Sequence, residues 1–188
     1  SAASDVYKRQ GYELSYLQLQ MQPHFLYNTL ETLCGMIEMN NKSEAIGLVS
    51  LISSFYRDTL GKGKEIITLE QELKITCGYL KIMQKRYPGC FYFETSLEPE
   101  VLSCSIPKLT LQPLVENSIL HNIEARDFLM IDISGRCENG IIILQVQDNG
   151  TGMDADTMKE ILKPKKQGKK GYVFSLSLIH ISEPTSRS

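Results

Sequence analysis

The first part of the chain carries apolar residues in steps of three and four, the spacing that predicts amphipathic helices. Pro23 interrupts the first run, between residues 12 and 39, and we expect it to kink that helix or to remove one hydrogen bond. A turn is expected at Asn40-Asn41. The apolar positions of this run are Leu14, Leu17, Met21, Phe25, Leu30, Leu33 and Ile37.

Two more helices are predicted before residue 88. Ser43 can cap the first of them, and a capping box formed by Thr68 and Gln71 predicts the start of the second, which should continue to about Arg86. Pro88-Gly89 would stop it. The apolar face expected for the helix after Ser43 consists of Ile46, Val49, Ile52, Phe55, Tyr56 and Leu60.

The pattern then changes to a mixture of strands and helices. Residues 91–96 look like a strand, and residues 107–122 look like a helix with an apolar interior. Residues 127–136 and 141–147 look like two strands joined by a turn that contains Glu138, Asn139 and Gly140. Another helix is expected over 153–162. The fold class is therefore α+β, with a boundary between the two parts near residues 87–90.

Composition narrows the possible functions. The chain has 188 residues, of which 20 are basic and 22 acidic, so bulk nucleic-acid binding is not indicated. Its five cysteines are scattered without a CxxC pair, which argues against a zinc site or a disulfide framework and fits a reducing cytosol. No apolar run approaches the roughly 18 residues that a membrane span needs. Any membrane attachment would have to come from a segment upstream of this sequence.

The two ends of the chain share a relation at the level of DNA. Residues 176–181 can be encoded by a string whose reverse complement encodes residues 5–10, DVYKRQ. That string resembles the transposon mosaic end of sequencing-library adapters, although chance through codon degeneracy is the alternative. We expect residues 1–10 and 176–188 to be translated adapter. Residues 11–88 would then form the helical region and residues 89–175 the mixed region, truncated at its C-terminal end.

Three motifs carry possible chemistry, and the first is PHFLYN at residues 23–28. On a helix, His24 and Asn28 lie on the same face one turn apart. An exposed imidazole can accept a phosphoryl group on a ring nitrogen. The periodicity by itself favours the other interpretation, a histidine packed between Phe25 and Leu26.

The second motif is LQPLVENSILHN, residues 111–122, which places Glu116 and Asn117 inside an apolar helix with His121 on the same face as Asn117. A buried amide is costly without a partner, and an amide oxygen can ligate Mg²⁺ beside phosphates. Helix capping or a local hydrogen-bond network explains these residues equally well.

The third motif is DNGTGM, residues 148–153, directly after the apolar strand. It would leave Asp148 at the rim of a pocket, where a carboxylate can accept from an exocyclic amine such as that of adenine. Gly150 and Gly152 would let the backbone approach a ligand closely. A simple turn is the alternative.

In this order and spacing, the three motifs resemble those of the LytS/YesM type of bacterial sensor histidine kinase. PHFLYNTL resembles that family's phosphoacceptor box, residues 67–87 its linking helix, IPKLTLQPLVENSILHN its N box, and DNGTGM the first glycine box of the GHKL ATPase fold. The similarity covers nearly all of residues 14–171. It implies a helical dimerisation and phosphoacceptor region, followed by a truncated α/β-sandwich ATPase domain.

The resemblance also implies roles for single residues. His24 would be phosphorylated, Asn117 would ligate Mg²⁺, and Glu116 would lie beside it in the catalytic cleft. His121 would line the phosphate end of the ATP site, and Asp148 would bind the adenine amine. Gly150 and Gly152 would shape the loop that opens the ATP lid.

The partners implied by the resemblance are a response regulator, whose aspartate would receive the phosphoryl group, and a second copy of the chain. The chain would be the cytoplasmic portion of a membrane protein.

Two departures qualify the resemblance. The residue after His24 is Phe25, as is usual in this family, where many other histidine kinases have an acid; Glu31 is a weak substitute as base. A second glycine-rich box is absent, and the lysine-rich run 163–170 is interpreted as a solvated loop, with part of the lid as the alternative. The competing hypotheses are a nucleotide-binding module of the same fold with another function, and an inactive truncated kinase.

Overall fold

A computed structural model describes residues 23–60, 65–124 and 128–150, and the backbone of residues 174–180. The described part begins with two antiparallel helices, α2 (Pro23–Glu38) and α3 (Lys42–Leu60). The turn between them is confirmed, with Asn40 in the left-handed region at φ 57°. Residues 12–22, where the predicted first helix would begin, lie outside the described residues.

Helix α3 differs from its prediction in two ways. It begins at Lys42, so Ser43 lies in its first turn and does not cap it. Ala45, Leu48 and Phe55 face the core, whereas Ile46 and Val49 are 59% and 46% exposed. The predicted face is therefore confirmed in part: Phe55 is buried, and Ile52 and Tyr56 pack partly buried against the core. The other positions are exposed, because only the neighbouring helices decide which side of α3 is covered.

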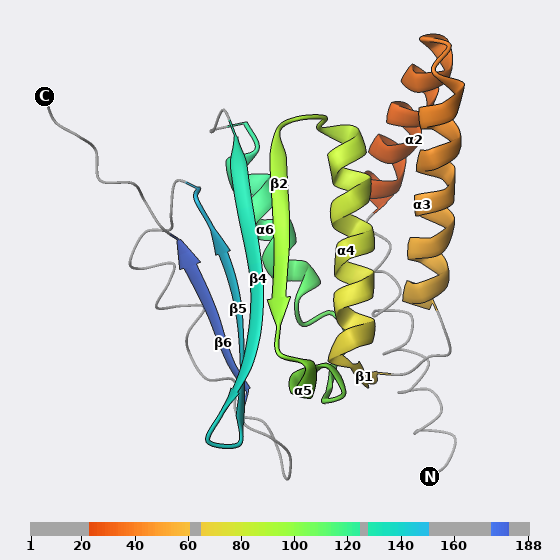
Figure 1. Ribbon diagram of the computed structural model, residues 1–188. Coiled ribbons are helices and arrows are strands. Elements are labelled where there is room, and N and C mark those ends of the chain that lie inside the picture. Colours follow the sequence, from red (N-terminus) through yellow and green to blue (C-terminus); the bar gives the residue numbers. More distant parts are fainter. Residues whose placement is uncertain (1–22, 61–64, 125–127, 151–173, 181–188) are drawn as a thin grey trace, which may run out of the picture.

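Helix α4 (Leu69–Arg86) stands between the α2–α3 pair and the rest of the molecule (Figure 1). The predicted capping box is confirmed: the Gln71 amide donates to the Thr68 hydroxyl at 3.2 Å, and the Thr68 amide donates to the Gln71 side chain at 3.3 Å. The helix ends before Pro88, and Gly89 adopts φ 72°, a conformation that glycine adopts without strain.

A four-stranded mixed sheet forms the other side of the molecule, in the order β2-β4-β5-β6. The predicted strands are confirmed as β2 (Phe91–Leu97), β4 (Leu129–Glu138) and β5 (Ile141–Asp148), and α6 packs on β4 and β5 (Figure 1). Strand β2 is parallel to β4, and β4 is antiparallel to β5. Alternate residues of β4, including Leu129, Ile131 and Ile133, are buried on the helix-covered face.

The predicted helix over 107–122 starts later than expected. Helix α6 spans Gln112–Asn122, while β3 (Ser105–Pro107) pairs with β1 (Ile66–Thr68), a strand that the sequence did not indicate. The helix cannot continue backwards because Leu109 takes the left-handed conformation, at φ 61°. The β1–β3 pair joins segments on both sides of the boundary expected near residues 87–90.

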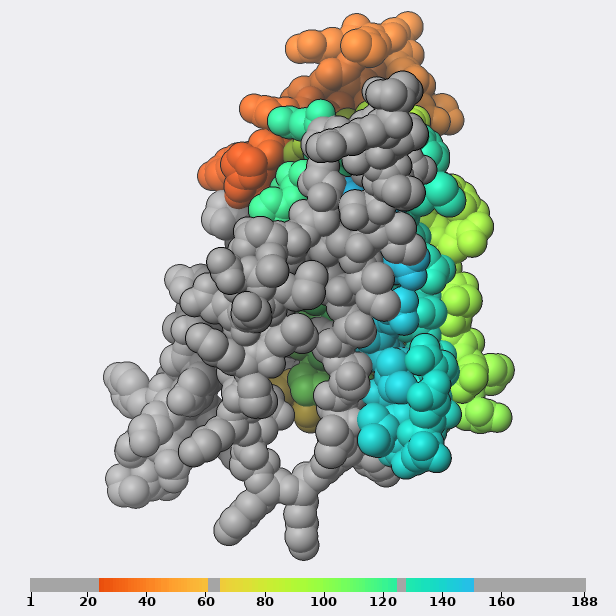
Figure 2. All heavy atoms as spheres, turned by 90° about the vertical axis from the view of Figure 1, so that its left-hand side faces the viewer, coloured from red at the N-terminus to blue at the C-terminus, as the bar shows by residue number. Residues whose placement is uncertain are grey.

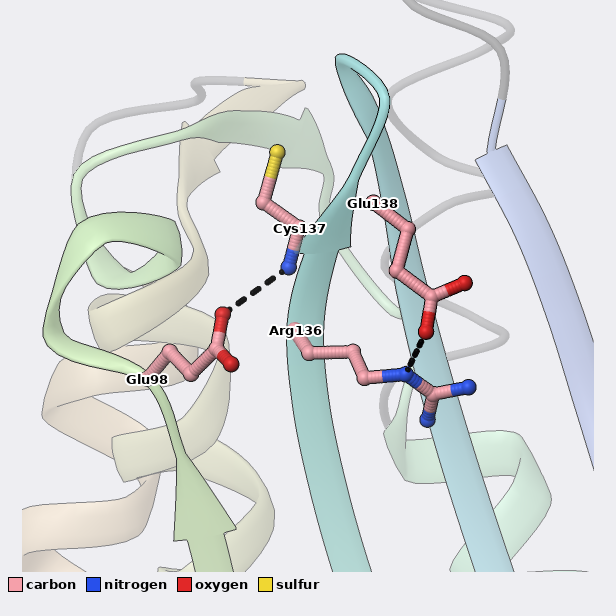
Figure 3. Close-up of polar contacts among 4 residues, drawn as sticks. All are labelled: Glu98, Arg136, Cys137 and Glu138. Carbon is pink, nitrogen blue, oxygen red and sulfur yellow. Dashed lines mark hydrogen bonds and ion pairs between the residues drawn. The ribbon is translucent and has the colours of Figure 1, made fainter.

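The β4–β5 hairpin closes through a two-residue turn. Asn139 and Gly140 have φ values of 51° and 77°, which is typical of the Asn-Gly hairpin turn that the sequence predicted. Beyond the end of β2, a short helix, α5 (Pro99–Leu102), follows. Figure 3 shows Glu98 beside the end of β4 that extends past β2: its carboxylate accepts from the Cys137 amide at 3.0 Å, next to the Arg136–Glu138 ion pair.

The backbone of β6 (Phe174–His180) pairs in parallel with β5. We had expected no strand in residues 176–188, and the missed signal is the alternation of apolar and hydroxyl residues in FSLSL, which is the period of a strand. The helix predicted over 153–162 and the lysine-rich run lie outside the described residues. Within the described ranges, no helix combines the length and the apolar character needed to cross a bilayer.

Candidate functional site

The PHFLYN motif lies at the start of α2, where His24 is exposed and Phe25 is 9% exposed. The structure therefore contradicts the packed-histidine interpretation, because Phe25 and not His24 enters the core. The Asn28 amide nitrogen lies 3.2 Å from Nδ1 and 3.3 Å from Nε2 of His24. It can donate to whichever ring nitrogen holds the lone pair, and the expected shared face of His24 and Asn28 is confirmed.

Phe25 fixes the direction in which His24 points. Its ring packs against Phe55 of α3 and Tyr79 of α4, with centroid distances of 5.8 and 5.3 Å. The Thr29 hydroxyl, one turn further along, donates to the Phe25 carbonyl at 2.6 Å. Because consecutive residues on a helix point about 100° apart, burying Phe25 in this cluster turns His24 towards solvent.

The N-box motif lies on α6, and its residues divide between two sides of the helix. Ser118 and Asn122 are buried, at 0% and 1% exposed. Glu116 and Asn117 are half-buried, and His121 is exposed. The Glu116 carboxylate accepts a hydrogen bond from Gln112, one turn earlier, at 2.8 Å. The polar side predicted from the sequence therefore exists, but a second polar pair lies beneath it.

Asp148 ends β5 and is 2% exposed, so it lies below the surface rather than at an open rim. One carboxylate oxygen accepts from the Ser118 hydroxyl at 2.6 Å, and the other accepts from the Gly150 amide at 2.9 Å. The N box and the first glycine box, 30 residues apart, thus meet through a buried hydrogen bond. The neighbouring Asn149 side chain accepts from the Met130 amide at 2.8 Å, which ties this turn to the start of β4.

Gly150 packs against the Asn122 side chain, which explains why this position has no side chain of its own. A Cβ at position 150 would lie 2.2 Å from the Asn122 Cγ and Oδ1 atoms, far inside contact distance. The Asn122 amide donates to the Ser118 carbonyl at 2.8 Å, so it is held in place below the turn. Because Gly150 has no side chain, the turn can lie directly against α6. The expected close approach of this backbone to a ligand stays a prediction. Gly152 lies outside the described residues.

Ser118 and Asn122 are the residues that the sequence reasoning missed. They lie one turn apart, each one position after a residue that was selected, Asn117 and His121. Polar residues four apart within an apolar helix are the signal that could have identified them. Two polar pairs on adjacent strips of α6 indicate that the helix contacts polar partners on two sides.

Tyr79 of α4 is close to residues of both α2 and α6. Burial raises the pKa of the Tyr79 hydroxyl, and the nearby negative charge of Glu116 raises it further. Tyr79 therefore has Phe25 of α2 against its ring and Glu116 of α6 within electrostatic range. Figure 2 shows the face of the molecule on which the start of α2, in red-orange, and atoms of α6, in green, both reach the surface.

Comparisons with known proteins show what the chain is similar to. Residues 12–91 match the family model described as histidine kinase. The chain is similar to the sensor histidine kinase YesM of Bacillus subtilis, with 36% identity over 143 residues, 76% of this chain and 25% of the relative. These matches support a fragment of a histidine kinase of the LytS/YesM type.

Two further relatives align to a similar extent. The sensor protein LytS of Staphylococcus epidermidis is 33% identical over 153 residues, which cover 79% of this chain and 25% of the relative. The sensor histidine kinase BtsS of Escherichia coli is 33% identical over 138 residues, 73% of this chain and 24% of the relative. The chain thus spans about a quarter of the length of these relatives. The mixed helices and sheet after residue 88 fit the expected fold class.

Proposed function

We propose that this protein is the catalytic part of an ATP-dependent protein-histidine kinase of a two-component system. The γ-phosphoryl group of ATP would pass to His24 and then to an aspartate of a response regulator. The observation that carries the proposal is the exposed His24, held beside the buried Phe25 and one turn from Asn28. Two relatives support it, since YesM and BtsS are named as sensor histidine kinases.

The nucleotide end of the site would be built on Asp148 and α6. The Asp148 carboxylate accepts from the Ser118 hydroxyl and the Gly150 amide. A carboxylate is the type of group that would accept from the exocyclic amine of adenine. The amide oxygen of Asn117, on the half-buried strip of α6, is a ligand type that suits Mg²⁺. These residues fit the two groups, and His121 and Gly152 stay predictions for the same site.

In phosphoryl transfer, the protein mainly positions the reacting groups. A ring nitrogen of His24 would attack the γ-phosphorus; the nitrogen–phosphorus bond forms as the bond to the bridging oxygen breaks, and the electron pair leaves with ADP. The other ring nitrogen can then release its proton. Asn28 would orient the ring through the contact described above. When bound, Mg²⁺ would neutralise charge on the phosphates.

The proposal is tested by incubation with ATP labelled in the γ-phosphoryl group. We expect an acid-labile, base-stable label that disappears in His24→Gln and persists in His180→Gln, the matched control. Asn117→Asp should also remove the label. Label that survives in His24→Gln would refute the assignment of the acceptor, and a wild-type protein that neither binds ATP nor becomes labelled would refute the kinase proposal for this chain.

We also propose that the protein forms a homodimer through α2 and α3. A groove of about 480 Å³ runs between these helices, lined in part by Leu33, Ile37, Ile46 and Val49. Ile37 is 61% exposed. A second pair of helices packed against this groove would complete a four-helix bundle. In light-scattering measurements, Ile46→Asp with Val49→Asp should convert dimer to monomer. The control is Tyr92→Asp, an exposed position on the sheet, and an unchanged dimer in the α3 variant would exclude this interface.

A further inference from the structure

The loop before the N-box helix is held in an unfavourable conformation. Leu109 has φ 61°, in the left-handed region where a branched side chain is disfavoured. The helix that follows lacks a side-chain cap of the usual kind, since Leu111 at the cap position makes no such bond. The first amides of a helix need acceptors, so the start of α6 depends on a partner from elsewhere in the chain.

Glu72 of α4 is that partner. It is 0% exposed, and its two carboxylate oxygens accept from different amides of the loop, Leu109 at 3.0 Å and Leu111 at 2.9 Å. A negative charge at the start of a helix also interacts favourably with the helix dipole. Burial raises the pKa of Glu72, while bonds from the backbone of residues 109–112 lower it in part. Burying a carboxylate costs free energy unless its oxygens accept hydrogen bonds.

A lysine fixes the same loop from the other side. Lys108 is 8% exposed, and its ammonium group donates to the Thr59 carbonyl of α3. Burial lowers the pKa of Lys108, and the negative charge of Glu72 opposes that change. The Lys108 amide donates to the Glu65 carbonyl at 2.9 Å. The loop is therefore bonded to the end of α3, to the segment after it and to α4, all on the phosphoacceptor side of the chain.

The position of α6 follows from these bonds. Glu116 and Asn117 lie within two turns of the loop, and Ser118 carries the hydrogen bond to Asp148. We propose that Glu72 is a positioning residue for the nucleotide site: by binding the Leu109 and Leu111 amides, it holds the N-box side chains at a fixed place relative to the linking helix. The functional part of this inference rests on the proposed kinase activity, whereas the structural part does not.

The test compares Glu72→Gln with two control variants. Glu70→Gln changes an exposed acid on the same helix, and Thr68→Ala weakens the start of α4 without removing either carboxylate bond to the loop. Amide resonances of residues 116–118 are recorded by NMR, together with the KM for ATP and the kcat of His24 phosphorylation. In Glu72→Gln we expect these resonances to shift and the KM to rise about tenfold, beyond any change in Thr68→Ala. Adding Leu109→Gly, which removes the strain, should recover part of the loss and provides a second variant if Glu72→Gln folds poorly.

The outcomes separate the two proposals. Resonances of 116–118 that stay unchanged in Glu72→Gln, or that shift equally in Thr68→Ala, overturn the positioning role. A wild-type chain without ATP binding overturns the kinase proposal, while the resonance comparison still decides whether Glu72 positions α6. A KM that rises equally in Glu72→Gln and Thr68→Ala shows a general loss of stability and also overturns the inference.

Discussion

Replacing Gly150 by alanine should destabilise the fold through a single clash. The new Cβ would lie 2.2 Å from Asn122 atoms, and Asn122 is 1% exposed and bonded to the Ser118 carbonyl. Relieving such overpacking in a dense interior costs about 1–3 kcal/mol. If Asn122 moves and its bond breaks, the loss of the hydrogen bond adds about 1 kcal/mol. We therefore expect the free energy of unfolding to fall by roughly 2–4 kcal/mol.

The assay is urea unfolding followed by circular dichroism, with two glycines as matched controls. Gly35 and Gly47 lie inside α2 and α3, and a Cβ at either position would meet nothing within 4 Å. Alanine there should stabilise the protein by about 0.5–1 kcal/mol, because glycine is a poor helix residue. The double variant Gly150→Ala with Asn122→Ala should recover much of the loss, since the clashing side chain is gone.

The reasoning is refuted if Gly150→Ala behaves like the two controls, or if the double variant is additive. Additivity would show that the cost at position 150 comes from the backbone of the turn and not from Asn122. A loss that is coupled to Asn122 would confirm that the first glycine box is shaped by α6.

The remaining predictions concern stability. Thr68→Ala removes the capping box and should lower the free energy of unfolding by about 1 kcal/mol in urea denaturation. Phe25→Ala should cost about 3–5 kcal/mol by the same measurement, because it opens the aromatic cluster. Tyr27→Ala, at a residue 67% exposed, should change stability by less than about 0.5 kcal/mol. The pKa of Glu72 is raised in the folded state, so the folded protein binds this proton more tightly than the unfolded chain; Lys108 is the charged neighbour. The free energy of unfolding of the wild type, measured relative to Glu72→Gln, should therefore fall as the pH rises above the ordinary pKa of 4.5.

Each of these stability predictions can be contradicted by a specific result. A Thr68→Ala variant that keeps wild-type stability would show that the cap contributes nothing. Gln71→Ala should then leave the free energy of unfolding unchanged as well. Equal losses in Phe25→Ala and Tyr27→Ala would contradict the burial of Phe25. A wild-type advantage over Glu72→Gln that grows with pH would mean that the amide bonds outweigh burial and that the pKa is lowered.

The sequence by itself determined the elements whose signals are local. The capping box at Thr68, the turn at Asn139-Gly140 and the shared face of His24 and Asn28 each depend on residues within a few positions of one another. Such bonds form wherever the local backbone forms, so spacing is sufficient to predict them. The family resemblance rested on the same short motifs.

Only the tertiary structure decided which residues are covered and which distant groups meet. Phe25 and not His24 enters the core because α3 and α4 supply an aromatic pocket for it. Ser118 bonds to Asp148, 30 residues later in the chain, and Glu72 bonds to the strained loop at Leu109, 37 residues later. A helical pattern specifies an apolar stripe but not its neighbours, and a buried polar group needs a partner that the pattern does not identify. For this reason the start of α6 and the exposed Ile46 on α3 could not be predicted from periodicity.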